Sequence, residues 1–320
     1  QITLAEELCE HSCFDKVFFC NSGLEANECA IKIARKFGHT KGIEVPNIIV
    51  LKHAFHGRSI ATLSATGNPS VREDFSPYTE GFIFVDESDL NGIRKIVEEN
   101  KNVVAIFFEP ILGEGGVVPI DLSVIKGIRE ICDEHDLLMM CDEVQCGMGR
   151  SGKWFAHQWA EIKPDVITMA KGLAGGVPVG AVIVSEKANI FKPGNHGSTF
   201  GGNPLAMRAA LETLSIIEDE KLVENALEVG KKLKKALSKS LNGFPGVRGI
   251  RGKGLMLGIV LDRDAHDILE LGLKAGLTFS VTAGNVIRLV PALTITEAEA
   301  DELVKRITPV IRSFLAQPKI

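Results

Sequence analysis

The sequence lacks the features that mark nucleic-acid-binding, membrane-spanning and exported proteins. Basic residues are not in excess: 36 Lys and Arg stand against 41 Asp and Glu, for a formal net charge of -5, and no basic stripe stands out. Nucleic acid is therefore not an expected partner. The longest apolar runs, such as Val103–Phe108, have the length of a strand and are far too short to span a bilayer. No charged-then-apolar leader opens the chain, so export is not expected.

The cysteines show no pairing pattern. They are odd in number and include no C-x-x-C pair, which in a chain of this length indicates reduced thiols and a cytoplasmic protein. His53 and His56 have the spacing of metal ligands, but no third ligand of suitable spacing accompanies them, so no metal site is expected. The seven cysteines are Cys9, Cys13, Cys20, Cys29, Cys132, Cys141 and Cys146.

Internal repeats, low-complexity tracts and Pro-rich linkers are also missing. The chain has 320 residues, of which 45% are hydrophobic, and this is enough for one large domain and a smaller one. It begins at Gln1, directly within a helical pattern marked by Leu4 and Leu8. We therefore expect it to be part of a longer polypeptide whose N-terminal segment is missing here.

Short apolar runs alternate with longer amphipathic runs up to about residue 204. Near-continuous apolar strands separated by helices predict an α/β fold, with a mostly parallel sheet covered by helices on both faces. In such a sheet, ligands bind outside the carboxyl ends of the strands. The strand candidates are Val17–Cys20, Asn47–Leu51, Gly81–Val85, Val103–Phe108, Leu137–Cys141, Asp165–Met169 and Gly180–Val184. The helix candidates among them are Leu24–Phe37, Asp89–Glu99 and Ser123–His135.

The pattern changes after residue 204, where helices become longer and strands shorter. This change predicts a smaller α+β domain. We therefore divide the chain into a large domain, residues 1–209, and a C-terminal small domain, residues 210–320. The helix candidates in this part are Pro204–Ile217, Lys221–Ser240, Ala265–Ala275 and Thr296–Phe314, and the strand candidates are Gly254–Val260, Leu277–Val281 and Val286–Val290.

Lys171 lies where an apolar strand gives way to a glycine-rich turn. It follows the run Asp165–Ala170 and precedes Gly172–Pro178. We expect these flanks to keep the amine from water, and a desolvated amine loses its proton more readily and attacks carbonyls. Taken alone, such a lysine is more often a solvated surface charge. The other motifs decide between these interpretations.

The stretch Asn21–Glu28 follows a strand candidate and opens a helix candidate. Ser22 and Glu25 have the spacing of a capping box. The N–H groups of Gly23 and Leu24 would then point out of the helix start, where phosphate binds readily. A plain capped helix is an equally good interpretation of this stretch alone.

Three other strand candidates are followed by polar or aromatic residues. Asp142 ends a strand that should be buried, and a buried carboxylate needs a cationic partner, a role that a protonated pyridine nitrogen would fill. Phe55 and Arg58 can supply a stacking surface and a carboxylate clamp, although a core Phe beside a surface Arg is the simpler interpretation of that pair alone. Glu109 and Glu114 lie in a glycine-rich stretch after a strand, and carboxylates there more often point into a site.

Two later motifs complete the set. The loop His196–Pro204 is rich in glycine and hydroxyl groups and suits phosphate, and Arg288 lies on an otherwise apolar run. An edge-strand arginine with its head in water is the alternative for Arg288. A phosphate cradle, an aromatic stacker, a buried Asp and a buried Lys are together the parts that hold pyridoxal 5′-phosphate. From Gln1 to about Phe314 the chain resembles the class III (ω-amino) aminotransferases of fold type I, and among them the acetylornithine aminotransferase branch most.

The resemblance implies roles at the cofactor ring. Lys171 would bond covalently to the cofactor aldehyde and act as general base once released. Asp142 would pair with the pyridinium nitrogen, and Gln145 would reach the phenolic oxygen. Phe55 would stack on one ring face, and Glu109 would lie near the cofactor and position its neighbours.

The resemblance also implies a phosphate site shared between two subunits. Ser22, Gly23 and Leu24 would hold the phosphate; the family more often has Ala, Val or Thr in place of Leu24, a change that a main-chain contact tolerates. Ser198 and Thr199 would complete the phosphate site of the neighbouring subunit, so a homodimer would be required for activity.

The substrates implied are N-acetylornithine and 2-oxoglutarate. Arg58 would bind the α-carboxylate of the amino substrate, and Arg288 that of 2-oxoglutarate. Glu114 would pair with Arg288 while the ω-amine is bound and swing away for the keto acid. Ornithine, succinylornithine and 4-aminobutyrate aminotransferases remain alternatives. A non-catalytic domain that senses pyridoxal phosphate in a transcription regulator is an alternative from another class, although the sequence has no basic helix-turn-helix pattern.

Overall fold

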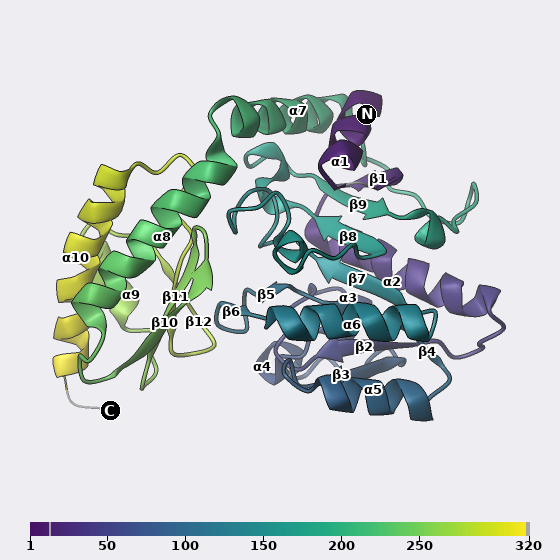
Figure 1. Cartoon of the computed structure of the whole chain (residues 1–320), viewed down its shortest axis with the longest axis horizontal. Helices are drawn as coiled ribbons and strands as arrows, with labels where there is room; N and C mark the ends of the chain where they lie inside the picture. The colour runs from purple at the N-terminus through teal and green to yellow at the C-terminus, as the bar shows by residue number, and fades with distance from the viewer. Residues whose placement is uncertain (13, 318–320) are drawn as a thin grey trace. The chain divides into compact units, whose positions relative to one another are not determined.

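The structure, a computed structural model, describes residues 1–12 and 14–317. It contains two compact units (Figure 1), and each is described by itself below. The first unit comprises Gln1–Pro110, Ile120–Met148 and Trp154–Ile216, and the second comprises Ile111–Pro119, Gly149–Lys153 and Ile217–Ile320. The sequence pattern had assigned two segments of the second unit, Ile111–Pro119 and Gly149–Lys153, to the large domain of residues 1–209.

A seven-stranded sheet organises the first unit. Its order is β1-β9-β8-β7-β4-β2-β3, and β9 alone runs antiparallel to its neighbours. The predicted α/β class with a mostly parallel sheet is therefore confirmed, and each of the seven predicted strands is present with its ends shifted by one residue at most. The strands are β1 (Lys16–Cys20), β2 (Asn47–Leu51), β3 (Phe82–Val85), β4 (Val103–Phe108), β7 (Leu138–Asp142), β8 (Val166–Met169) and β9 (Gly180–Val184).

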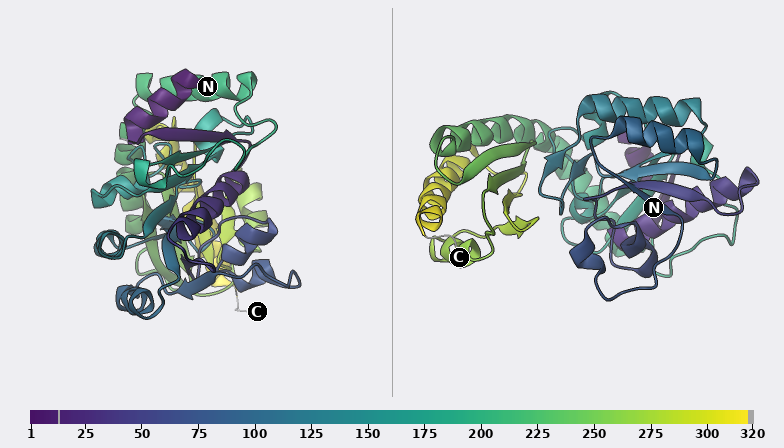
Figure 2. Two further views of the ribbon diagram at one scale, coloured as in Figure 1. Left: turned by 90° about the vertical axis from the view of Figure 1, so that its right-hand side faces the viewer. Right: turned by 90° about the horizontal axis from the view of Figure 1, so that it is seen from below.

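Helices cover both faces of this sheet, with α2 on one face and α5 and α6 on the other (Figure 2). The double cover explains the continuous apolar runs, because every residue of β4, β7, β8 and β9 is buried. The α-helices are α1 (Ile2–Ser12), α2 (Gly23–Thr40), α3 (Ile60–Ala65), α4 (Pro69–Arg72), α5 (Leu90–Glu99), α6 (Leu122–Glu134) and α7 (Pro204–Asp219). The 3-10 helices are η1 (Ala156–Ala160), η2 (Lys171–Ala174) and η3 (Glu186–Ala188).

The second unit has an antiparallel sheet of order β10-β11-β13-β12, with its own apolar core. The predicted strand Leu277–Val281 is wrong in its first half, since β12 begins only at Ser280, and β10 was not predicted. The strands are β10 (Val247–Lys253), β11 (Met256–Leu261), β12 (Ser280–Thr282) and β13 (Val286–Leu289), and β5 (Ile111–Leu112) pairs with β6 (Val118–Pro119). The helices are α8 (Leu222–Leu241), α9 (Ile268–Lys274) and α10 (Glu297–Ala316).

The described cysteines are free thiols, five of them buried and Cys9 half-buried, whereas Cys13 lies outside the described residues. Burial raises the pKa of Cys20, Cys29 and Cys132 to about 12, so these thiols stay protonated at neutral pH. Within residues 1–12 and 14–317, no group of three His, Cys, Asp or Glu side chains is arranged to hold a metal ion. No helix of that same part is long and apolar enough to cross a membrane.

Candidate active site

A cavity of about 450 Å³ lies in the first unit, lined by residues that follow β2, β4, β7 and β8 at their carboxyl ends. This is where an open α/β sheet binds its ligands, and the volume suits a cofactor-sized molecule. The lining residues are Asn21, Ser22, Gly23, Leu24, Asn27, Phe55, His56, Gly57, Arg58, Glu109, Asp142, Val144, Gln145, Ala170, Lys171, Gly176, Val177, Pro178 and Val179. Eight of the predicted cofactor and substrate residues thus meet in one cavity, together with Glu109.

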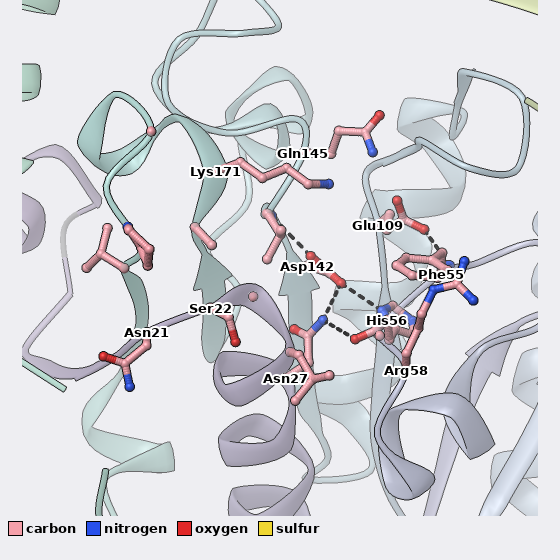
Figure 3. Close-up of a pocket in the computed structure, with 18 of the residues that line it drawn as sticks. Asn21, Ser22, Asn27, Phe55, His56, Arg58, Glu109, Asp142, Gln145 and Lys171 are labelled. Atoms are coloured by element: carbon pink, nitrogen blue, oxygen red, sulfur yellow. Dashed lines mark hydrogen bonds and ion pairs between the residues drawn. The ribbon is translucent and has the colours of Figure 1, made fainter. Parts of the chain in front are cut away.

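Lys171 lies two residues after the end of β8 and extends into the cavity beside Gln145 and above Asp142 (Figure 3). The expectation that it is shielded from water is wrong, because its side chain is exposed. Its flanking residues do not cover it: it opens the short η2 turn, in which Gly172 has no side chain and Leu173 and Ala174 are themselves buried. Its φ of 45° places it in the left-handed region, which costs a non-glycine residue on the order of 1–3 kcal/mol. Such strain is typical of functional positions.

Asp142 ends β7 at the floor of the cavity and is only 3% exposed. Its Oδ2 accepts hydrogen bonds from His56 Nδ1 and Asn27 Nδ2, both at 2.8 Å, and its Oδ1 accepts one from Val144 N at 3.0 Å. His56 is itself buried and stacks on Phe107, with ring centroids 4.0 Å apart. Sequence reasoning missed His56 and Asn27, since it examined His56 only as a metal ligand.

The start of α2 forms one end of the cavity. Ser22 caps the helix by accepting a hydrogen bond from Glu25 N, as predicted, whereas the Glu25 carboxylate accepts from Asn21 N rather than completing the box on Ser22. Gly23 and Leu24 are the first two helical residues, whose N–H groups have no intrahelical acceptor. A Cβ on Gly23 would lie 2.7 Å from Val144 Cγ1, so glycine is needed here for close packing.

Phe55 and Arg58 line the cavity on the segment that follows β2. The Arg58 guanidinium carbon lies 5.8 Å from the centre of the Phe55 ring. Phe55 N donates to Glu109 Oε1 at 2.8 Å, and Glu109 is buried. The glutamate after β4 thus fixes the main chain beside the aromatic ring.

A second glutamate fixes the segment that carries Val144 and Gln145. Both oxygens of Glu143, which is fully buried, accept hydrogen bonds: Oε1 from His157 N and Nδ1 at 2.8 and 2.9 Å, and Oε2 from Ala156 N at 2.8 Å. These contacts hold the segment against η1. Sequence reasoning did not single out Glu143 or His157.

Ser198 and Thr199 are the predicted cofactor residues that do not line the cavity. Ser198 Oγ accepts a hydrogen bond from Asn21 Nδ2 at 3.0 Å and donates one to Glu25 Oε1 at 3.2 Å. Thr199 is exposed, and so is Phe200 beside it. The loop is therefore tied to the start of α2 while its tip faces outward.

Arg288 and Glu114 meet within the second unit. Arg288 Nη1 donates to Glu114 Oε1 at 2.7 Å, and its Nε donates to Ser280 Oγ at 3.0 Å. The edge-strand interpretation of Arg288 is wrong, because β13 lies between β11 and β12. The pairing with Glu114 that the resemblance implied is present.

The cavity residues fit pyridoxal phosphate. The α2 start offers free N–H groups to a phosphate, Phe55 offers a ring face, and Lys171 offers a primary amine to an aldehyde. Hydrogen bonds from Asn27 and His56 hold the buried carboxylate of Asp142 at the floor of the cavity. A protonated ring nitrogen would find its partner there.

Comparisons with known proteins agree with this chemistry. The family described as aminotransferase class-III matches residues 1–311. Acetylornithine aminotransferase 1 of Bordetella bronchiseptica is 48% identical over 99% of this chain and 81% of its own. An ornithine aminotransferase structure from Toxoplasma gondii, described with pyridoxal phosphate at partial occupancy in its active site, has a TM-score of 0.93 at 34% identity, over 97% of this chain and 76% of its own.

A structure of N-acetylornithine aminotransferase from Stenotrophomonas maltophilia has a TM-score of 0.83 at 36% identity, over 98% of this chain and 80% of its own. The family match and these identities extend over nearly the whole chain, well beyond the residues that line the cavity. The chain therefore belongs to the class-III aminotransferases, enzymes that transfer amino groups with pyridoxal phosphate.

Proposed function

We propose that this protein transfers the terminal amino group of N-acetylornithine to 2-oxoglutarate, a step of arginine biosynthesis. The observation that carries the proposal is the 48% identity to an acetylornithine aminotransferase over 99% of the chain. A second acetylornithine aminotransferase, from Nitrosomonas europaea, is also 48% identical, over 98% of the chain.

The roles of the cavity residues form part of the proposal. The bound cofactor supplies an aldehyde and an electron-withdrawing ring. Lys171 would hold the aldehyde end through Nζ and, once free, would accept and return a proton at that same atom. Asp142 would hold the ring nitrogen in its protonated form, Gln145 would bind the phenolic oxygen, and Phe55 would cover one ring face.

Phosphate binding falls to the α2 start and carboxylate binding to two arginines. The N–H groups of Gly23 and Leu24, with the Ser22 cap, would bind the phosphate. Arg58 binds the carboxylate of the amino substrate, since it lies beside the ring of Phe55. Arg288 binds a carboxylate of 2-oxoglutarate once Glu114, its present partner at 2.7 Å, moves away.

Ornithine is the second candidate amine. Its support is structural, because the Toxoplasma gondii ornithine aminotransferase has a TM-score of 0.93, against 0.83 for the N-acetylornithine enzyme. Sequence identity points the other way, with 48% to an acetylornithine aminotransferase and 34% to this ornithine enzyme. We favour N-acetylornithine because substrate choice depends on individual side chains rather than on the backbone path.

Four amine donors separate the candidates. Purified protein with pyridoxal phosphate is assayed with N-acetylornithine, ornithine, succinylornithine and 4-aminobutyrate, each with 2-oxoglutarate, and glutamate formation is measured. We expect the highest kcat/KM with N-acetylornithine, and parallel double-reciprocal lines because the amino group is stored covalently. A higher kcat/KM with any other donor would replace the proposed substrate.

We also propose that the active enzyme is a homodimer. Three large apolar side chains are strongly exposed in the first unit: Ile2 at 76%, Phe200 at 71% and Leu205 at 73%. The chain start and the loop that carries Phe200 lie together, since Gln1 Nε2 donates a hydrogen bond to Gly202 O. Exposed apolar residues gathered in this way mark association sites. If a second copy of the chain bound at this surface, the exposed Thr199 of one subunit would approach the phosphate site of the other subunit.

The variant Phe200→Glu is expected to shift the protein from dimer to monomer and to lower transaminase activity. A charge in an apolar interface is left without a partner. Light scattering after size exclusion measures the mass, and Leu273→Glu, at an exposed leucine of the second unit, is the matched control. A wild-type protein that is monomeric and fully active would contradict the homodimer proposal.

We also propose that the protein is located in the cytoplasm, which can be tested by localising a fluorescent fusion.

A further inference from the structure

We propose that Asn27 is a positioning residue that sets the charge and the place of Asp142, and so connects the phosphate end of the site to its ring end. Asn27 lies on α2, one turn after the phosphate-facing start, and is 2% exposed. The proposal rests on the pyridoxal phosphate site and not on the identity of the amine substrate.

One amide group contacts both elements that hold the cofactor ring (Figure 3). Asn27 Nδ2 donates to Asp142 Oδ2 at 2.8 Å and to the main-chain oxygen of His56 at 2.7 Å. Asp142 belongs to β7, and His56 adjoins the stacking residue Phe55. A single side chain of α2 thus fixes the carboxylate and the aromatic segment relative to the helix that faces the phosphate.

The orientation of the amide is determined by its surroundings. Both atoms facing it are acceptors, so the NH2 group must point towards them, and the reverse orientation would place an amide oxygen against a carboxylate. Within the described part of the chain, Asn27 Oδ1 has no hydrogen-bond partner. Its two donated bonds therefore account for the presence of an amide at this buried position.

A donated hydrogen bond favours the ionised form of a buried carboxylate. Asn27 and His56 both donate to the same oxygen of Asp142, so two hydrogen bonds hold this carboxylate in one orientation. A charged Asp142 is what a protonated ring nitrogen requires. Asn27 thus acts on the cofactor through Asp142, and by joining β7 to α2 it also fixes the ring-binding element relative to the phosphate-binding one.

Two nearly isosteric variants separate this role from simple packing. Asn27→Leu removes the donated bonds but adds no charge. Asn27→Asp places a second carboxylate at the 2.8 Å contact, where two like charges cannot both be ionised, so the pair takes up a shared proton and Asp142 loses part of its charge. Packing alone predicts that the two variants behave alike, or that the leucine variant is worse.

The matched control is Asn225, whose Nδ2 also donates to two acceptors, Leu293 O at 2.7 Å and Ile295 O at 3.0 Å. Both of its acceptors are main-chain carbonyls of the second unit, and no carboxylate is involved. Asn225→Asp and Asn225→Leu therefore show what loss of a bridging amide does to folding alone.

The full-length variants are compared by three measurements: the pyridoxal phosphate dissociation constant from absorbance titration, the urea unfolding of the cofactor-free protein, and kcat and KM separately. We expect Asn27→Asp to weaken cofactor binding and lower kcat by about 10–100-fold, the size of one charge-assisted hydrogen bond, with a smaller loss for Asn27→Leu. KM for the amine should change little. The Asn225 variants should alter unfolding only.

Equal cofactor affinity and kcat in Asn27→Asp and Asn27→Leu would overturn the proposal, as would losses confined to unfolding. If either variant fails to fold, Asn27→Ser, whose shorter side chain does not reach Asp142, replaces it in the comparison with wild type. Because cofactor binding is measured without any amine, the result is independent of which substrate the enzyme prefers.

Discussion

Lys171→Ala is expected to abolish transamination and the covalent retention of pyridoxal phosphate. Lys171 is the lysine that lines the cavity, and its Nζ is the primary amine placed to bond with an aldehyde there. The substitution removes both the attachment and the group that moves the proton, and loss of a general base alone lowers the rate by about 10²–10⁴-fold. The fold should be unaffected, because the side chain is exposed and removing it leaves no cavity in the core.

Absorbance spectra after gel filtration measure the first effect. Wild-type protein given pyridoxal phosphate should keep a visible band that borohydride reduces, and Lys171→Ala should lose it. Lys171→Arg keeps the charge but offers no primary amine, so it should behave like alanine. Lys192→Ala, at an exposed lysine of the same unit, is the control and should resemble wild type. A persistent reducible band in Lys171→Ala would disprove the assignment.

The strands of the first unit could be predicted because they are buried on both faces and read as continuous apolar runs. β4, for example, is Val103–Phe108 in both the prediction and the structure. β10 could not be found in this way, since Val247–Lys253 contains two glycines and two arginines and only one of its residues is buried. It pairs at the edge of its sheet through main-chain hydrogen bonds, for which the sequence has no apolar pattern.

The site was predicted where a motif lies next to a strand end, and missed where side chains far apart in sequence meet. Phe55, Asp142 and Lys171 line one cavity because parallel strands bring their carboxyl ends to the same edge. His56 and Asp142 are 86 positions apart, so their contact depends on the strand order, which the sequence pattern does not specify. The exposure of Lys171 was mispredicted for a similar reason, since its immediate neighbours do not decide what covers it.

Asp142→Ala is expected to have the second large effect, on both cofactor affinity and rate. Three donors now converge on this carboxylate, from His56, Asn27 and Val144, and all lose their acceptor. Removing one partner of a buried charge pair costs about 3–5 kcal/mol, which corresponds to roughly 10²–10⁴-fold in kcat/KM. Asp142→Asn should also lose most activity, because its neutral amide cannot hold a protonated ring nitrogen.

Asp165 provides the matched control for this second prediction. It is also a buried aspartate next to a strand of the same sheet, with Arg129 Nη1 at 2.9 Å and Met139 N at 2.8 Å donating to its Oδ2, but it does not line the cavity. Asp165→Ala should lower the urea midpoint while leaving kcat per folded molecule unchanged. Asp142→Ala should lower kcat per folded molecule, even if this variant has a higher urea midpoint than Asp165→Ala. If the two variants lost activity only in proportion to unfolding, Asp142 would be a structural residue and the ring nitrogen would need another partner.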